Sequence, residues 1–467
     1  INAALNTKDE NDSPEEHFTD TIKAACGLAD PNAVWGMTQA APELVHWLLK
    51  LGVKFNMSGY DDVDLRNFGG QKKKRTAFAQ SDTGKQIMTA MIDAVRRKEA
   101  SGMVERFSHH SFLTLRLCDN ICCGCVIRDE YSQETVELPG DAVIVATGGM
   151  HGLFGNTTGS LSNTGEVTAE LFRLGVPLAN GEMIQYHPTT VKCGGKRMLI
   201  SEAARGEGGR LFAMKDGKQW YFMEEKYPEL GNLMPRDITA REIWKVSRES
   251  EVFLDMTEIS DEIISNKLSG LADDCMTYLH KDIRKEPVSV LPGIHYFMGG
   301  ILVDEQHRTP IQNLYAAGEC CAQYHGANRL GGNSLLGALY GGRVAAKSAC
   351  EQADVVDLSC ATQIDFPPAS QISEIKQLNK VMQETMGVVR NENTLLNGIQ
   401  TVQALTGNLP LLGMAVLKSA LARKESRGAH WREDYPKSND DDYLKTTVAR
   451  FDGKQIQISF VPVPERR

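Results

Sequence analysis

Residues 314–336 contain the pattern that most constrains the fold of this 467-residue chain. The run from Leu314 to Ala317 is short and apolar, which predicts a buried strand, and Gly318-Glu319 ends it. The segment from His325 to Leu336 then places Arg329 in front of a glycine-rich helix start. The first N–H groups of a helix attract anionic or electron-rich ligands, and an arginine can grip a carboxylate through two parallel hydrogen bonds. The pattern predicts a place that holds a cofactor and a small acid side by side.

Other segments indicate an α/β chain. The apolar run Ala142–Ala146, followed by Gly148-Gly149, predicts a buried parallel strand and a tight turn. Hydrophobic periodicity predicts a helix over 83–100, and residues 337–349 read as a small-residue helix packed against the sheet. Three further elements are expected, namely a strand at 103–107, helices within 372–425 and a last strand at 455–463.

Length, charge and hydropathy limit the class of protein. A chain this long usually forms two or three domains. Its net charge of −9 argues against nucleic acid as a partner, and Lys72–Arg75, the one basic run, is interpreted as a solvated loop. We find no uninterrupted apolar stretch of roughly 18 residues, the length that predicts a membrane span.

The chain has eleven cysteines, and four of them are close together, at positions 118, 122, 123 and 125. The alternation of Leu113, Leu115 and Leu117 with polar residues predicts a β-hairpin that turns at Asp119-Asn120. Adjacent residues of a strand point to opposite faces, so these cysteines cannot converge on one metal ion. We expect no metal site and reduced structural cysteines, as in a cytoplasmic-type compartment.

The arginine segment, together with His295-Tyr296-Phe297-Met298-Gly299-Gly300, resembles the flavoprotein subunit of succinate dehydrogenase and fumarate reductase, in the FAD-dependent oxidoreductase 2 family. The resemblance covers nearly the whole chain. It implies an α/β fold with a Rossmann-like FAD-binding domain, an inserted α+β capping domain and a C-terminal helical domain. The implied limits are 1–182 and 295–360 for the FAD-binding domain, 183–294 for the capping domain, and 361–467 for the helical domain and tail.

One expected motif is absent. A dinucleotide-binding sheet normally opens with a strand, G-x-G-x-x-G and a helix. The chain contains no such unit and begins Ile1-Asn2-Ala3-Ala4, which in the family follows a Gly-Gly pair just after that unit. We therefore expect the chain as given to begin inside the fold. The family usually tethers its flavin to a histidine in the missing stretch, so the sequence leaves covalent or non-covalent FAD open.

The resemblance implies a site for a four-carbon dicarboxylate, fumarate or succinate. His187, in Tyr186-His187-Pro188-Thr189, matches the family histidine that holds a substrate carboxylate. Ser201 stands where the family more often has a threonine; the hydroxyl is kept, and the β-branch that orients it is lost. His295 and Arg329 complete the set of substrate-binding residues.

Three residues match the catalytic positions of the family. Glu202 and Arg205 are three residues apart, so they can pair on one helical turn. The resemblance makes Arg236 the proton donor, refilled through Glu202 and Arg205, while hydride passes between flavin N5 and the substrate. Without the resemblance, the residues themselves favour a plain reading, with a surface ion pair at 202–205 and a helix N-terminus at Arg236.

Four positions resemble cofactor-binding residues. Glu319 matches the strand-end acid that binds FAD hydroxyls, and Ser334 and Leu335 match backbone contacts near the isoalloxazine ring. Glu166 follows Asn163-Thr164-Gly165, where the family usually has aspartate. On its own, Glu319 is equally consistent with a carboxylate at a helix N-terminus.

The resemblance also implies an iron–sulfur partner subunit and a cytoplasmic location. Attachment to the inner face of a membrane would then come through partner subunits, including an anchor subunit. Two alternatives stay open, namely L-aspartate oxidase and a non-catalytic flavoprotein paralogue. Met298 favours the succinate/fumarate branch over the oxidase, which tends to have cysteine there. The same residues serve both directions of the reaction, so the sequence leaves the direction open.

Overall fold

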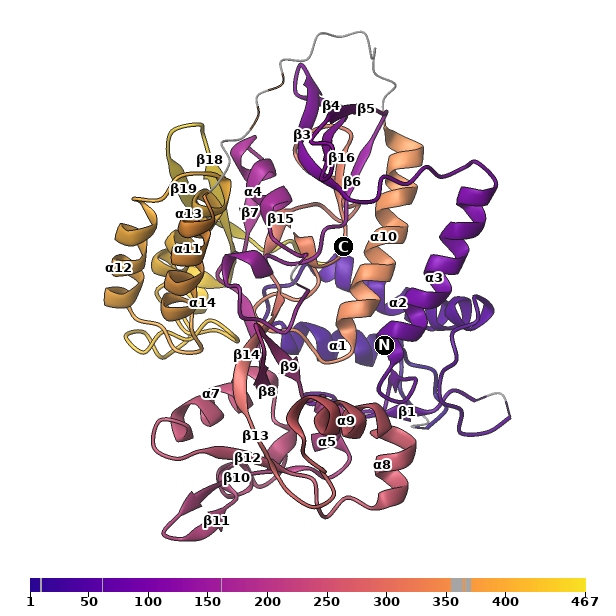
Figure 1. Ribbon diagram of the computed structural model, residues 1–467, viewed down its shortest axis with the longest axis vertical. Coiled ribbons are helices and arrows are strands. Elements are labelled where there is room, and N and C mark those ends of the chain that lie inside the picture. Colours follow the sequence, from indigo (N-terminus) through magenta and orange to yellow (C-terminus); the bar gives the residue numbers. More distant parts are fainter. Residues whose placement is uncertain (9–10, 61, 161, 354–363, 365, 367–370) are drawn as a thin grey trace.

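The computed structural model describes residues 1–8, 11–60, 62–160, 162–353, 364, 366 and 371–467. Figure 1 shows three groups of elements: an upper group around α10, a lower group around β10–β12, and a C-terminal group around α11–α13. This is a mixed α/β fold with a helical C-terminal group, as the sequence predicted.

The strand-and-helix unit predicted at 314–336 is present in the upper group. β16 (Leu314–Ala316) pairs in parallel with β6 (Val143–Val145), and α10 (Asn333–Gln352) packs against both. β16 is buried throughout, but Ile144 of β6 is 41% exposed. The parallel strand predicted at 142–146 is confirmed, but it is not buried throughout, because β16 is the one strand that pairs with β6 within the described residues.

The predicted hairpin is confirmed. β3 (His110–Cys118) and β4 (Ile121–Asp129) are antiparallel and turn at Asp119-Asn120, where both residues have positive φ, and β5 (Thr135–Pro139) adds a third strand. Cys122, Cys123 and Cys125 are free thiols, whereas Cys118 is disulfide-bonded, contrary to expectation. The strand predicted at 103–107 does not form, and Met103 is 68% exposed.

Two capped helices and the predicted helix α3 (Thr83–Ala100) complete one side of the upper group. Ser13 caps α1 (Pro14–Ala24), Asp30 caps α2 (Pro31–Lys50), and each helix begins with proline, which suits the first helical position. The remaining short elements of this group are β1 (Leu65–Arg66), β2 (Thr76–Ala77), α4 (Glu166–Arg173), β7 (Leu178–Ala179), β15 (Gly300–Leu302) and β17 (Cys321–Ala322).

Arg75 corrects the interpretation of the basic run. Its side chain is fully buried and forms ion pairs with Asp12 at 2.8 Å and Asp20 at 2.9 Å. Two carboxylates that converge on one guanidinium can compensate for its burial. Lys72 and Lys74 are exposed as predicted, so the solvated loop ends one residue before Arg75.

The lower group is joined to the upper group by two long paired strands, β8 (Ile184–Cys193) and β14 (Leu291–Phe297). β9 (Lys196–Leu199) extends this sheet. The rest is a sheet with a separate hydrophobic core, made of β10 (Arg210–Lys215), β11 (Lys218–Trp220), β12 (Val252–Asp255), β13 (Val288–Ser289), α5 (Glu202–Gly206), α6 (Phe222–Lys226), α7 (Arg236–Val246), α8 (Asp261–Lys267) and α9 (Ser269–Asp274).

The C-terminal group contains the helices predicted within 372–425. They are α11 (Ile372–Thr385), α12 (Glu392–Val402) and α13 (Asn408–Ala422), and they share a hydrophobic core with α4. The final strand is confirmed as β19 (Ile456–Pro462). It pairs with β18 (Lys445–Phe451), which was not predicted; after the short α14 (Asp440–Tyr443), this hairpin extends the sheet of β17, β15 and β7.

Candidate active site

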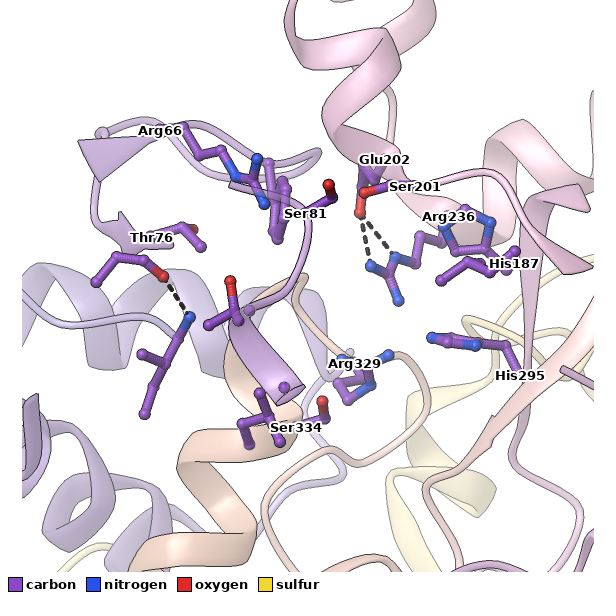
Figure 2. Close-up of a pocket in the computed structure, with 18 residues that line it drawn as sticks. Arg66, Thr76, Ser81, His187, Ser201, Glu202, Arg236, His295, Arg329 and Ser334 are labelled. Carbon is purple, nitrogen blue, oxygen red and sulfur yellow. Dashed lines mark hydrogen bonds and ion pairs between the residues drawn. The ribbon is translucent and has the colours of Figure 1, made fainter. Parts of the chain in front are cut away.

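A cavity of about 190 Å³ lies where the upper group, the lower group and the β8–β14 pair meet. Figure 2 shows its labelled side chains, which come from segments more than a hundred residues apart. Seven predicted site residues line it, namely His187, Ser201, Glu202, Arg236, His295, Arg329 and Ser334. Leu335 lines it as well, so the fold brings together residues that the sequence only suggested.

Arg236 and Glu202 form a bidentate ion pair on one wall. Arg236 is the first residue of α7, and its Nε and Nη2 donate to Glu202 Oε2 at 2.9 Å and 2.7 Å. Glu202 Oε1 accepts from the Gly69 amide at 3.1 Å and lies 3.4 Å from Arg205 Nη2. Burial raises the pKa of Glu202, but the charges of Arg236 and Arg205 outweigh it and lower the pKa overall.

These contacts decide against the plain reading of the 202–205 pair. All three side chains are buried, so this is not an exposed surface ion pair. Arg205 donates from Nη1 to the Asn232 carbonyl at 2.6 Å, and burial lowers its pKa. One carboxylate thus holds two guanidiniums, and the cluster keeps a net positive charge next to the cavity.

Arg329 is a third buried guanidinium, and no residue that the structure describes forms an ion pair with it. It is 3% exposed, lies over the Tyr296 ring at 4.3 Å, and its Nε has no hydrogen-bond partner there. Burial, and then the charge of Arg236, lowers the pKa of Arg329 to about 9. A buried cation without a partner is costly, so an anion that enters the cavity would compensate for it.

Two histidines face the same cavity from neighbouring strands. His187 on β8 and His295 on β14 have ring centroids 5.2 Å apart in an edge-on arrangement. Burial lowers the pKa of each well below its ordinary value, so both rings are neutral. Nδ1 of His187 lies 3.1 Å from the Thr189 carbonyl and 3.3 Å from the Thr189 amide, so either tautomer of this neutral ring finds a partner at Nδ1.

A second cavity, of about 290 Å³, lies on the other side of His295, Ser334 and Leu335, which line both. Glu319 lines it and accepts from the Phe297 amide at 3.0 Å. A Cβ on Gly149 would lie 2.6 Å from Glu319 Oε1, so only glycine allows this approach. Helix α10 begins here without a side-chain cap, so its first N–H groups can bind a ligand.

The two connected cavities fit an extended cofactor. A carboxylate stands at one end, uncapped helix N–H groups at the middle, and a cationic pocket at the other end. Carboxylates bind ribityl and ribose hydroxyls, and helix N–H groups suit a flavin carbonyl. Glu319, Ser334 and Leu335 line one cavity together, and flavin binding by them stays a prediction.

Glu166 lies outside both cavities. It is exposed at the first turn of α4, and its amide donates to Thr164 Oγ1 at 3.3 Å. Asn163, three residues earlier, lines the second cavity. Cofactor binding by Glu166 stays a prediction.

Sequence reasoning missed several residues of the site. Arg66 and Phe68 line the first cavity, and His151 and Thr158 line the second. Thr158 Oγ1 lies 2.8 Å from His295 Nδ1. None belongs to a motif that we singled out; His151, two residues after the Gly148-Gly149 turn, was the one with a usable signal. No group of three or more possible metal-ligating side chains occurs in the ranges that the structure describes.

Known proteins share both the sequence and the fold. The FAD binding domain family matches residues 1–335, and the fumarate reductase flavoprotein C-terminal family matches 405–466. The succinate dehydrogenase flavoprotein subunit of Bacillus subtilis is 36% identical, over all of this chain and 90% of its own length. L-aspartate oxidase of Pyrococcus furiosus is 33% identical, over 92% of this chain and 86% of its own.

Among solved structures, E. coli quinol fumarate reductase FrdA superposes with a TM-score of 0.88 at 26% identity. The match covers 99% of this chain and 88% of that one. FAD is accordingly the cofactor of this family member, and its binding by Glu319, Ser334 and Leu335 stays a prediction. With a family match over most of its length and a close relative over all of it, the chain belongs to the FAD-binding flavoprotein family of succinate dehydrogenase and fumarate reductase.

Proposed function

We propose that this flavoprotein interconverts fumarate and succinate. The observation that carries the proposal is the arrangement of charge around the first cavity. Within the described ranges Arg329 is buried without an ion pair, and Arg236 pairs with Glu202 on the wall nearby. One guanidinium is thus available for a carboxylate, and the other is set for proton transfer.

The cavity offers donors for both ends of a dicarboxylate. Arg329 can bind one carboxylate through a fork of two N–H groups. Neutral His187 and His295, with the Ser201 hydroxyl, supply further donors without adding charge. This set would orient a four-carbon diacid, because a substrate held at both ends has little freedom to turn.

Arg236 is suited to deliver a proton at the substrate. A guanidinium carries five N–H groups. Three of them are engaged here, two by Glu202 and one by the side-chain oxygen of Gln185 at 3.0 Å, so one N–H on each of Nη1 and Nη2 is left. Glu202 and Arg205 would return the proton after each turnover. FAD, when bound, supplies the hydride chemistry.

The segment 183–294 would act as a cap over the FAD-binding domain (1–182 and 295–360), with 361–467 as a C-terminal domain. Glu202, Arg205 and Arg236 all belong to this segment. Its closure would exclude water and bring Arg236 to the substrate.

An electron partner is part of the proposal. The relatives from Bacillus subtilis and Wolinella succinogenes are named flavoprotein subunits, which supports an iron–sulfur partner and, through it, attachment to the inner face of a membrane from the cytoplasm. No helix within the described ranges is both long and apolar enough to cross a bilayer. The direction of the reaction depends on this partner and on the flavin potential.

The second candidate function is L-aspartate oxidation, which the Pyrococcus furiosus relative favours. Met298 and Tyr296 belong to one buried hydrophobic cluster, and the Arg329 guanidinium lies over the Tyr296 ring. The methionine that supports the succinate/fumarate branch is thus close to the substrate arginine. A non-catalytic paralogue is the third reading, and the complete set of His187, Arg236, His295 and Arg329 argues against it.

Anaerobic turnover of fumarate with a reduced viologen dye tests the proposal, with aspartate plus oxygen assayed in parallel. Dye oxidation that depends on fumarate, without peroxide from aspartate, is the expected result. Peroxide from aspartate would assign the oxidase reaction. No activity in either assay, from a protein that contains FAD, would refute both proposed enzyme activities.

A further inference from the structure

A chain of hydrogen bonds runs behind Arg236, away from the substrate cavity. Arg236 Nη1 donates to Gln185 Oε1 at 3.0 Å, and Gln185 Nε2 donates to Asn328 Oδ1 at 3.0 Å. Asn328 Nδ2 then donates to Asp237 Oδ1, again at 3.0 Å. Two neutral amides therefore connect the guanidinium to a carboxylate.

The ends of the chain fix its direction. A guanidinium can only donate and an ionised carboxylate can only accept, so each amide between them has one favourable orientation. Gln185 makes a second contact in that orientation, since its Nε2 also donates to the backbone carbonyl of Arg329 at 2.8 Å. One side chain thereby ties both arginines of the substrate cavity together.

The arginines need such a tie, because there is free space on both sides of them. Arg236, Arg329 and Phe68 line the substrate cavity and also a larger cavity of about 480 Å³ between residues 67–72 and 229–238. Asn328 and Asp237 line the cavity of about 480 Å³ and not the substrate cavity. Gln185 is fully buried behind the arginines. Without a fixed acceptor on Nη1, the Arg236 side chain has room to turn away from the substrate.

We propose that Gln185, Asn328 and Asp237 are positioning residues, whose directed hydrogen bonds hold the Arg236 guanidinium toward the substrate cavity and fix its spacing from Arg329. The proposal rests on the proposed dicarboxylate function. Glu202 holds Nε and Nη2 of Arg236, and the amide chain holds Nη1, so the plane of the guanidinium is defined from two sides.

A charge exchange along the chain tests this role. In Asp237→Asn the chain loses the charge-assisted hydrogen bond at its far end, so only the guanidinium end still orients the two amides. In Asn328→Asp two carboxylates face each other. In the double variant Asp237→Asn/Asn328→Asp, the carboxylate has moved one position closer, where it still only accepts, and Gln185 keeps its orientation.

We expect each single variant to lower kcat for fumarate by roughly tenfold or more, the effect of one charge-assisted hydrogen bond. KM, flavin content and the thermal midpoint should change little for Asp237→Asn. The double variant should recover kcat to within about threefold of the wild type, which independent effects would not allow. Asp273→Asn, an exposed change in the same segment, is the matched control.

Two results would overturn the positioning role. One is an unchanged kcat in Asp237→Asn, and the other is a double variant no better than the worse single. An inactive wild type would instead refute the proposed function, so the two failures are distinguishable.

Discussion

Arg329→Met should make the substrate-free protein more stable while it abolishes dicarboxylate binding. The Arg329 guanidinium is buried without an ion pair among the described residues, and burial lowers its pKa to about 9. Since an arginine in water titrates above 12, its charged form costs about 5 kcal/mol here at neutral pH. The substitution also removes the contact of Arg329 with the Tyr296 ring, which lowers the free energy of unfolding by about 2 kcal/mol.

We therefore expect the free energy of unfolding to rise by about 3 kcal/mol in Arg329→Met at pH 7. The lowered pKa of Arg329 also determines how the stability gain of Arg329→Met changes with pH. The folded state is penalised while Arg329 is charged, and the penalty decreases as the pH rises through 9. The gain from the substitution should therefore decrease above pH 9.

Thermal or urea unfolding, with and without a dicarboxylate such as succinate, measures both effects. At a hundredfold excess over Kd, the ligand should stabilise the wild type by about 2.7 kcal/mol and leave Arg329→Met unchanged. Arg423→Met is the matched control. Arg423 is at least as buried, but its guanidinium forms ion pairs with the carboxylates of Glu182 at 2.7 Å and Glu425 at 2.8 Å.

The control variant should lose stability, because those acceptors are left unpaired. If Arg329→Met also loses stability, or if succinate still stabilises it, the account of an unpaired cation that awaits a carboxylate is wrong.

Three further predictions follow from the described contacts. Arg236→Lys should abolish fumarate reduction, because lysine cannot hold Glu202 and Gln185 together, and flavin absorbance should stay nearly intact; an equal loss of flavin would count against the proton-donor role. Arg75→Met should lower the free energy of unfolding in urea by about 3–5 kcal/mol, since it leaves two buried carboxylates unpaired, and an unchanged midpoint would contradict this. Stability should fall as the pH drops through about 6.5, by up to about 1.4 kcal/mol per pH unit for each buried histidine, because the unfolded chain binds protons that the folded one rejects. The buried histidines with a lowered pKa are His17, His187, His295, His307, His325 and His430. A calorimetric unfolding midpoint that does not change between pH 7 and pH 5 would refute this pH dependence.

The sequence predicted those parts of the site whose pattern of charge or hydrophobicity lies within a few neighbouring residues. The spacing of Glu202 and Arg205 predicted their pairing, and the glycine-rich run after Arg329 predicted the start of α10. Gln185 and Asn328 were missed because a neutral amide has no signature until its partners, more than fifty residues away, are known.

Burial was the least predictable property. Arg75 ends a lysine run that is typical of a solvated loop, yet it is fully buried by Asp12 and Asp20, which lie more than fifty residues earlier. The segment at 103–107 was expected to form a strand, but no described strand includes it or pairs with it. Both errors concern long-range partners, which local periodicity does not encode.

The β8–β14 pair has a mechanical consequence. His187 and His295 lie on the two strands that connect the lower group to the rest of the chain, with His187 opposite Gly293 in the register. Arg236 is hydrogen-bonded to Gln185 of β8, two residues before His187, and α7 packs against β8. Rotation of the lower group about these strands would therefore carry the two histidines and Arg236 together. The contact that would open is the one between Glu202 and the Gly69 amide of the upper group.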